Sequence, residues 1–119
     1  MRSDFSSAHA LRHYQGKCEA IHGHNFNVEL MVEGGVLTTD TELLVDFKVL
    51  KGELKKVLDT LDHKDLNQHP AFAERNPSSE NIAAYIYKGM QEALQELPVK
   101  VHSVSVSEKP AQSATYLEV

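Results

Sequence analysis

The chain has few cysteines, little basic charge and no long apolar run, and each of these absences excludes a class of protein. Cys18 is the single cysteine among 119 residues, which excludes an internal disulfide and a disulfide-framed secreted scaffold. The net charge of −5 argues against broad binding to nucleic acid or to anionic membranes. No apolar stretch reaches the length of a membrane span or a signal-peptide core. We therefore expect one soluble, cytoplasmic domain over residues 1–119.

The hydrophobic pattern predicts an α+β domain in which the helices are grouped together. The predicted strands cover residues up to about 10, residues 25–33, a return segment that ends near Val45, and residues of about 99–108 and 114–119. Gly34-Gly35 predicts the hairpin turn before the return segment. A shift of the apolar parity between Val101 and Val104 indicates a bulge or a twist. Such an antiparallel sheet exposes its edges unless it pairs with copies of itself.

Two amphipathic helices are predicted between the first strands and the last two. Asp46 is the expected N-cap of the first helix, and Ser78 or Ser79 caps the second, which Pro98 stops. The expected buried stripes are Phe47, Leu50, Leu54, Val57, Leu58 and Leu61 in the first helix, and Ile82, Ile86, Met90, Ala93, Leu94 and Leu97 in the second. Residues 66–77 are predicted to form a loop.

The strongest local chemical signal is the pair His22 and His24. Residues two apart in a strand project to the same face, so both imidazoles can approach one ion. His9, at the end of the first strand, supplies a third imidazole, and three imidazoles with an open fourth position form a catalytic zinc arrangement. Imidazole also suits copper, iron or nickel. The alternative is that the pair consists of two surface histidines.

Three further residues or pairs carry possible chemistry. Cys18 is either a fourth ligand, which would close the metal site, or a thiolate that acts as base or nucleophile near the metal. In Asp62-His63 the carboxylate can orient the ring, although a histidine that complements a helix dipole explains the pair as well. Glu108 lies at the end of an apolar strand, on the same face as Val104 and Val106. A carboxylate in an apolar surrounding needs a partner, such as a ligand with two parallel N–H donors. The alternative is that Glu108 lies at the strand end and faces water.

The ordered set of motifs resembles the 6-pyruvoyl-tetrahydropterin synthase family, and most closely its bacterial branch of 6-carboxytetrahydropterin synthases of queuosine biosynthesis. The resemblance runs through residues 5–9, 18–25, 45–47, 61–63, 66–67, 76–81 and 108. Three residues separate Cys18 from His22, and the resemblance ties this spacing to the carboxy-forming branch rather than to the pyruvoyl-forming animal enzymes.

The resemblance implies a role for each matching residue. The matches are His9, His22 and His24 for zinc; Cys18 as general base with Asp62 and His63 as proton-relaying dyad; and Glu108 as anchor of the pterin ring in a pocket lined by Ser78 and Ser79. The implied fold is the tunnelling fold (T-fold), a four-stranded antiparallel sheet with two helices packed on one face. Three such sheets would form a barrel, and two trimers would stack into a homohexamer.

The implied reaction is the zinc-dependent conversion of 7,8-dihydroneopterin triphosphate into 6-carboxy-5,6,7,8-tetrahydropterin, with release of acetaldehyde and triphosphate. Three rival readings remain: a pyruvoyl-forming synthase that eliminates triphosphate, a non-catalytic zinc-bearing module of the same fold, and a zinc hydrolase that would use Glu19 as its base.

Overall fold

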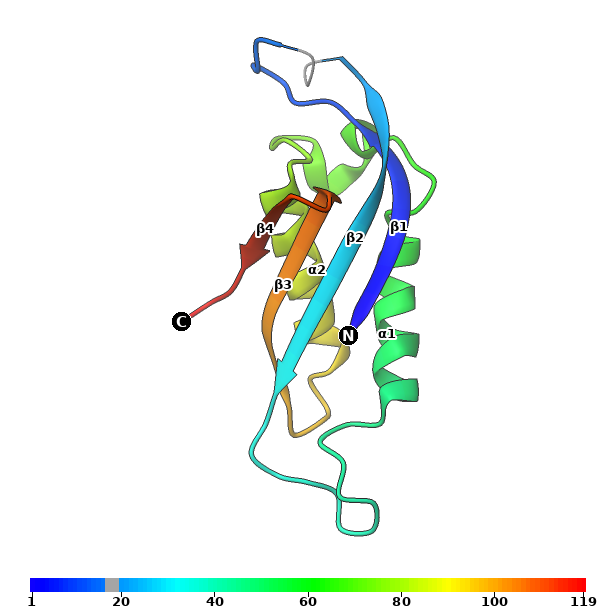
Figure 1. The fold of residues 1–119 in the computed structure, drawn as a ribbon, viewed down its shortest axis with the longest axis vertical. Coiled ribbons are helices and arrows are strands. Elements are labelled where there is room, and N and C mark those ends of the chain that lie inside the picture. Colours follow the sequence, from blue (N-terminus) through cyan, green and yellow to red (C-terminus); the bar gives the residue numbers. More distant parts are fainter. Residues whose placement is uncertain (17–19) are drawn as a thin grey trace.

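The computed structural model describes residues 1–16 and 20–119, which form one four-stranded antiparallel sheet and two α-helices (Figure 1). The strands are β1 (Arg2–His9), β2 (His22–Glu33), β3 (Lys100–Lys109) and β4 (Gln112–Tyr116), and they lie side by side in that order. The helices α1 (Phe47–Asp59) and α2 (Ser79–Ala93) and two short 3₁₀ turns, η2 (Leu66–Gln68) and η3 (Pro70–Phe72), lie between β2 and β3 in sequence. The predicted fold class is confirmed.

The hydrophobic core lies between one face of the sheet and the two helices. Phe5 of β1 stacks on Phe26 of β2, its partner in the strand register, with ring centroids 5.0 Å apart. The other core residues from the two central strands are Val28, Leu30, Val101, Val104 and Val106, and the helices add Leu50, Leu54, Leu58, Ile82, Ile86 and Met90. The opposite face of the sheet exposes polar side chains such as Asn27 and Glu29, as an antiparallel sheet with one covered face allows.

The predicted irregularity in β3 is confirmed as a bulge. Met31 pairs with Ser103 and Val32 pairs with Val101, so His102 is an extra residue in β3. Val101 and Val104 are therefore both buried although they are three residues apart.

The predicted return strand near Val45 is wrong. Residues 36–46 form turns and bends, because β2 is already paired with β1 on one side and with β3 on the other. A third strand would find no free edge of β2 to bind. Gly34 does not form the predicted hairpin turn. It allows Leu44 and Pro98 to pack against the backbone, since a Cβ at this position would lie 2.7 Å from Leu44 Cδ1 and 3.0 Å from the carbonyl oxygen of Pro98.

The helices begin where the sequence predicts, although their apolar stripes are shorter. Asp46 accepts a hydrogen bond from the backbone N–H of Lys48, and Ser78 caps α2 by accepting one from Asn81. Phe47 is 77% exposed and so does not belong to the buried stripe of α1. The second helix ends at Ala93 rather than near residue 97. Neither helix in the described ranges has the length and apolar character that a bilayer crossing requires.

The segment after α1 binds the outer edge of β1. The Asp62 carboxylate accepts a hydrogen bond of 2.8 Å from the backbone N–H of Ser6, and His63 N–H donates to the carbonyl of Ser6. Two residues further along β1, Ala8 N–H donates to the carbonyl of Lys64 over 2.9 Å. The hydrogen bond from Ser6, followed by the one from His63, holds the pKa of Asp62 below its ordinary value.

Asp62→Asn should change the pH dependence of stability. A carboxyl whose pKa is depressed by folding stabilises the folded chain above its unfolded-state pKa, and this stabilisation is lost as the pH falls through the folded-state pKa. The wild type should therefore have the higher melting temperature at neutral pH, and the difference from the Asp62→Asn variant should shrink toward about pH 3. A difference in melting temperature between the two proteins that stays constant from neutral pH to about pH 3 would contradict the lowered pKa of Asp62.

Candidate metal centre

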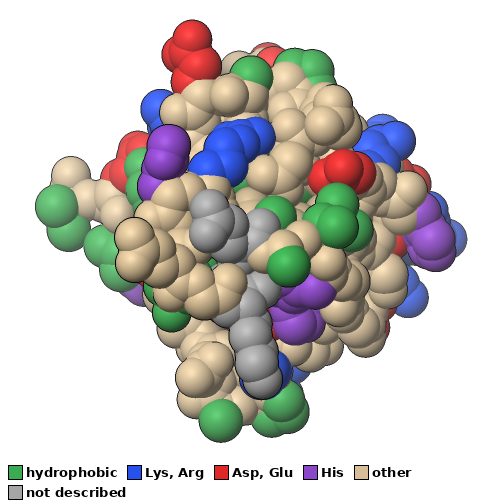
Figure 2. All heavy atoms as spheres, turned by 90° about the horizontal axis from the view of Figure 1, so that it is seen from above, with side chains coloured by type: hydrophobic (Ala, Val, Ile, Leu, Met, Phe, Trp, Pro, Cys, Tyr) green, Lys and Arg blue, Asp and Glu red, His purple; other side chains and the backbone are tan. Residues whose placement is uncertain are grey.

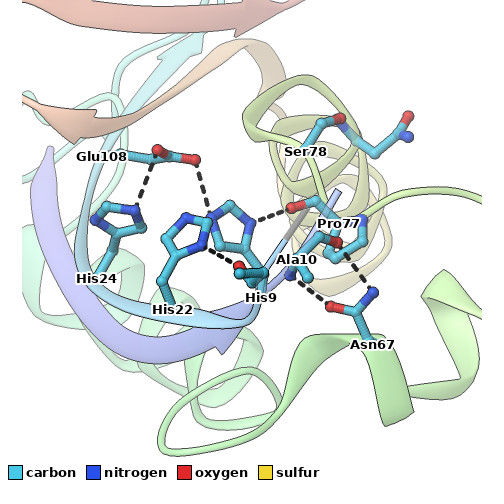
Figure 3. A network of polar contacts seen from close by, with 10 residues as sticks. His9, Ala10, His22, His24, Asn67, Pro77, Ser78 and Glu108 are labelled. Atoms are coloured by element: carbon cyan, nitrogen blue, oxygen red, sulfur yellow. Dashed lines mark hydrogen bonds and ion pairs between the residues drawn. The ribbon is translucent and has the colours of Figure 1, made fainter. Parts of the chain in front are cut away.

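Three histidines meet at one end of the sheet, on the face that covers the core. The register of β1 and β2 pairs His9 with His22 and Ser7 with His24, so side chains from both strands point to the same side. The ring centroid of His22 lies 4.6 Å from that of His9 and 4.6 Å from that of His24 (Figure 3). Figure 2 views this end of the molecule from above and shows histidine side chains that reach the surface. The predicted convergence of the three imidazoles is present in the structure.

The ring of His9 is fully buried and is oriented by the chain before α2. Its Nδ1 lies 2.7 Å from the carbonyl oxygen of Pro77. A carbonyl oxygen only accepts hydrogen bonds, so Nδ1 carries the proton and donates it. With Nδ1 donating, Nε2 is the nitrogen that faces His22 and His24, which is the arrangement of a metal-ligating histidine with an outer partner.

The Nε2 atom of His9 is buried and has no hydrogen-bond partner among residues 1–16 and 20–119. Oε1 of Glu108 lies 3.1 Å away, yet the angle does not make a hydrogen bond. A nitrogen lone pair and a carboxylate oxygen repel each other at this distance unless a proton or a cation lies between them. The donor set therefore fits a divalent metal ion.

The surroundings of the other two histidines act on different properties of the ring. The Nδ1 of His22 lies 2.8 Å from the carbonyl of Ala20 and donates to it, so Nε2 is the nitrogen that can face a metal. Burial lowers the pKa of His24 below its ordinary value, and the nearby His22, His9 and Lys109 lower it further against the opposing effect of Glu108. A ring that is neutral at physiological pH binds a metal without first losing a proton.

Glu108 lies closer to the histidines than the sequence indicates. It projects from β3 on the face of Val104 and Val106, as predicted, and its Oε2 lies 3.3 Å from Nε2 of His24. Its carboxylate and the three histidines offer ligand atoms that all lie within 4.8 Å of one another. Three imidazoles and a carboxylate are ligands that zinc accepts in tetrahedral sites.

A pocket of about 240 Å³ opens on the other side of Glu108. Its lining includes Ser78 and Ser79 at the N-terminus of α2, Leu11, and Gln112 in the first position of β4. The structure thus brings both serines of the predicted substrate pocket together with Glu108. It also adds Gln112 and Leu11, which carry no motif that would have revealed them.

The predicted dyad of Asp62 and His63 does not join this cluster. Asp62 and His63 lie on the outer edge of β1, where the ring Nδ1 is 2.9 Å from the carboxylate Oδ2 and the backbone of His63 has a positive φ of 55°. This geometry confirms that the two side chains pair with each other. Cys18, which is predicted to lie beside the metal, is outside the described residues.

Comparison with known proteins gives one consistent family. The family model described as 6-pyruvoyl tetrahydropterin synthase matches residues 1–119. The chain is 38% identical over 116 residues to the 6-carboxy-5,6,7,8-tetrahydropterin synthase of Synechocystis sp., covering 94% of this chain and 86% of that protein. It is 36% identical over 118 residues to the Bacillus subtilis enzyme of the same name, covering 93% of this chain and 78% of that one.

A solved structure shows the same fold over the whole chain. The 6-pyruvoyl tetrahydropterin synthase of Caenorhabditis elegans superposes with a TM-score of 0.84 at 27% identity, covering 100% of this chain and 93% of the other. The family match, the sequence relatives and the sheet with its histidine cluster all agree. The chain belongs to the 6-pyruvoyl tetrahydropterin synthase family.

Proposed function

We propose that the chain is a zinc-dependent lyase that converts 7,8-dihydroneopterin triphosphate and one water molecule into 6-carboxy-5,6,7,8-tetrahydropterin, acetaldehyde and triphosphate, in queuosine biosynthesis. The observation that carries this proposal is the buried Nε2 of His9, which has no hydrogen-bond partner among the described residues and faces His22, His24 and Glu108 in a chain of this family. The carboxy-forming reaction is favoured over the pyruvoyl-forming one by the names of the Synechocystis and Bacillus relatives and by the short spacing between Cys18 and His22.

In this proposal Glu108 orients the substrate. Its carboxylate borders the pocket lined by Ser78 and Ser79, and the two oxygens can accept the parallel N–H groups of an aminopyrimidine ring. The serine side chains would supply further hydrogen bonds at the ring. Holding the ring in one pose places the reacting carbons near the histidines, which converts the reaction into an effectively unimolecular one.

His9, His22 and His24 would hold the zinc ion, which when bound supplies a Lewis acid that polarises the hydroxyl oxygens of the substrate. Cys18 would act as the base that removes a proton from the side chain of the substrate, and the paired Asp62 and His63 would relay protons with it. Labilising the side chain in this way prepares the carbon–carbon bond for cleavage.

The position of Asp62 and His63 supports a site shared between subunits. They lie at the edge of the sheet rather than in the cluster of their own chain. A pocket of about 410 Å³ opens beside the start of β1, against Lys51 and Lys55 of α1, and this is where a strand of another copy can extend the sheet. A homohexamer built from edge-to-edge barrels would bring the dyad of one copy to a neighbouring site.

Two variants separate metal binding from substrate binding. His24→Ala should lose bound zinc and activity together, because it removes a ligand. Glu108→Gln should keep zinc and lower kcat/KM by about 10–100-fold. The amide has a single acceptor oxygen and turns its NH2 group toward the second N–H donor, whereas the carboxylate accepts one donor at each oxygen. Zinc content measured by mass spectrometry and steady-state kinetics check both variants. Loss of zinc from the Glu108→Gln variant would make Glu108 a ligand rather than the pterin anchor.

A product assay distinguishes the proposed reaction from its rivals. Purified protein incubated with 7,8-dihydroneopterin triphosphate should yield the mass of 6-carboxytetrahydropterin and free acetaldehyde, and a chelator should abolish both. Cys18→Ala should lower turnover by roughly 10²–10⁴-fold while zinc remains bound. The mass of the pyruvoyl product would indicate the alternative synthase, and an unchanged substrate would indicate a non-catalytic zinc-bearing module.

Mixed oligomers test whether the site is shared. Cys18→Ala and Asp62→Asn should each be inactive alone. If one copy supplies the cysteine and another the dyad, refolding the two variants together should restore about a quarter of the sites and of the activity. Mixing the folded variants without refolding is the control. Activity that stays absent after joint refolding would place the whole site within one chain.

A further inference from the structure

The chain that follows β1 is held by the side chains of two asparagines. Asn67 accepts a hydrogen bond from Ala10 N–H over 2.8 Å and donates to the carbonyl of Ala10 over 3.0 Å. Asn76 binds Arg12 in the same way, over 2.9 and 3.0 Å. Each side-chain amide thus imitates a neighbouring strand by pairing with both backbone groups of one residue. We call Asn67 and Asn76 the asparagine clamp.

Asn76 also fixes the segment that orients His9. Its own carbonyl accepts a hydrogen bond of 2.8 Å from the side chain of Asn81 in the first turn of α2. The next residue, Pro77, supplies the carbonyl that binds Nδ1 of His9. Asn76 therefore binds Arg12, in the chain after β1, and Asn81 of α2, and the next residue contacts His9. Figure 3 shows the contacts of His9 with Pro77 and of Ala10 with Asn67.

The same clamp determines one wall of the pocket beside Glu108. Leu11 lies between the two clamped residues, Ala10 and Arg12, and it lines the pocket. The Arg12 guanidinium adds hydrogen bonds of 3.2 Å to the carbonyls of Arg75 and Asn67, which links the two clamping loops to each other. A loosened clamp would therefore affect the pocket wall and the metal ligand together.

We propose that Asn76 is a positioning residue that couples the metal ligand His9 to the substrate pocket. It acts through the Pro77 carbonyl, which selects the tautomer of His9 with a free Nε2, and through Arg12, which holds Leu11 in place. The effect on zinc affinity rests on the proposed metal site alone, and the effect on KM rests also on the proposed substrate. Direct partners of metal-ligating histidines typically contribute about 10–100-fold to metal affinity, and Asn76 acts one contact further out because the Pro77 carbonyl is the direct partner.

The test compares zinc affinity among variants of similar stability. Asn76→Ala removes both hydrogen bonds to Arg12, and Asn76→Asp keeps the acceptor but removes the donor. Leu50→Ala is the matched control, because this buried residue belongs to α1 and lines a pocket away from the histidines. Each protein is titrated with Zn²⁺ against a chromogenic chelator, melting temperatures are recorded, and kcat and KM are measured with 7,8-dihydroneopterin triphosphate.

We expect Asn76→Ala to weaken zinc binding about 10-fold, at the lower end of the range for direct partners, and to raise KM, with Asn76→Asp in between. Leu50→Ala should lower the melting temperature and leave the zinc affinity at the wild-type value. Should Asn76→Ala fail to fold, Asn76→Asp carries the comparison. Wild-type zinc affinity in both variants of Asn76, or an equal loss of affinity in the control, would overturn the inference. A wild-type protein that binds no zinc would overturn the proposed metal site along with it.

Discussion

The antiparallel register between β1 and β2 is the constraint on which the candidate site depends. It sets His9 opposite His22 and Ser7 opposite His24, which puts all three imidazoles on the face that covers the core. Because side chains alternate between the faces of a strand, a slip by one residue would turn one strand's histidines toward the other face. The stacked pair of Phe5 and Phe26 opposes such a slip, since the ring on the slipped strand would leave the core with it.

The core passes into the site without a break. The ring of Phe26 lies edge-on to those of His9 and His24, with centroid distances of 5.1 and 5.7 Å. These two imidazoles therefore pack against an apolar side chain of the core. An apolar surrounding strengthens the interaction of polar groups with one another and penalises any that are left unpaired. The contacts of His9 with Pro77 and Glu108 therefore have larger interaction energies here than they would have at an exposed surface.

Sequence reasoning predicted those parts of the molecule that follow from periodicity. The alternation along β2, the shared face of His22 and His24, the inward position of Glu108 and the irregularity in β3 can all be inferred from residue spacing. The return strand failed because periodicity does not report which strands are neighbours, and β2 had no free edge. The hydrogen bonds of Asn67 and Asn76 to the backbone of Ala10 and Arg12 were not predicted, although the motif over residues 76–81 was recognised. Side-chain amides in loops show no periodic spacing from which such contacts could be inferred.

The bulge at His102 has a further effect on how β3 can vary. It lies between the part of β3 that pairs with the end of β2 and the part that leads to Glu108. An extra residue at this point absorbs a mismatch in side-chain alternation, so the strand start after Pro98 is uncoupled from the orientation of Val104, Val106 and Glu108. The direction of the Glu108 carboxylate therefore depends on the strand pairing beyond His102 and not on the residue at which β3 begins.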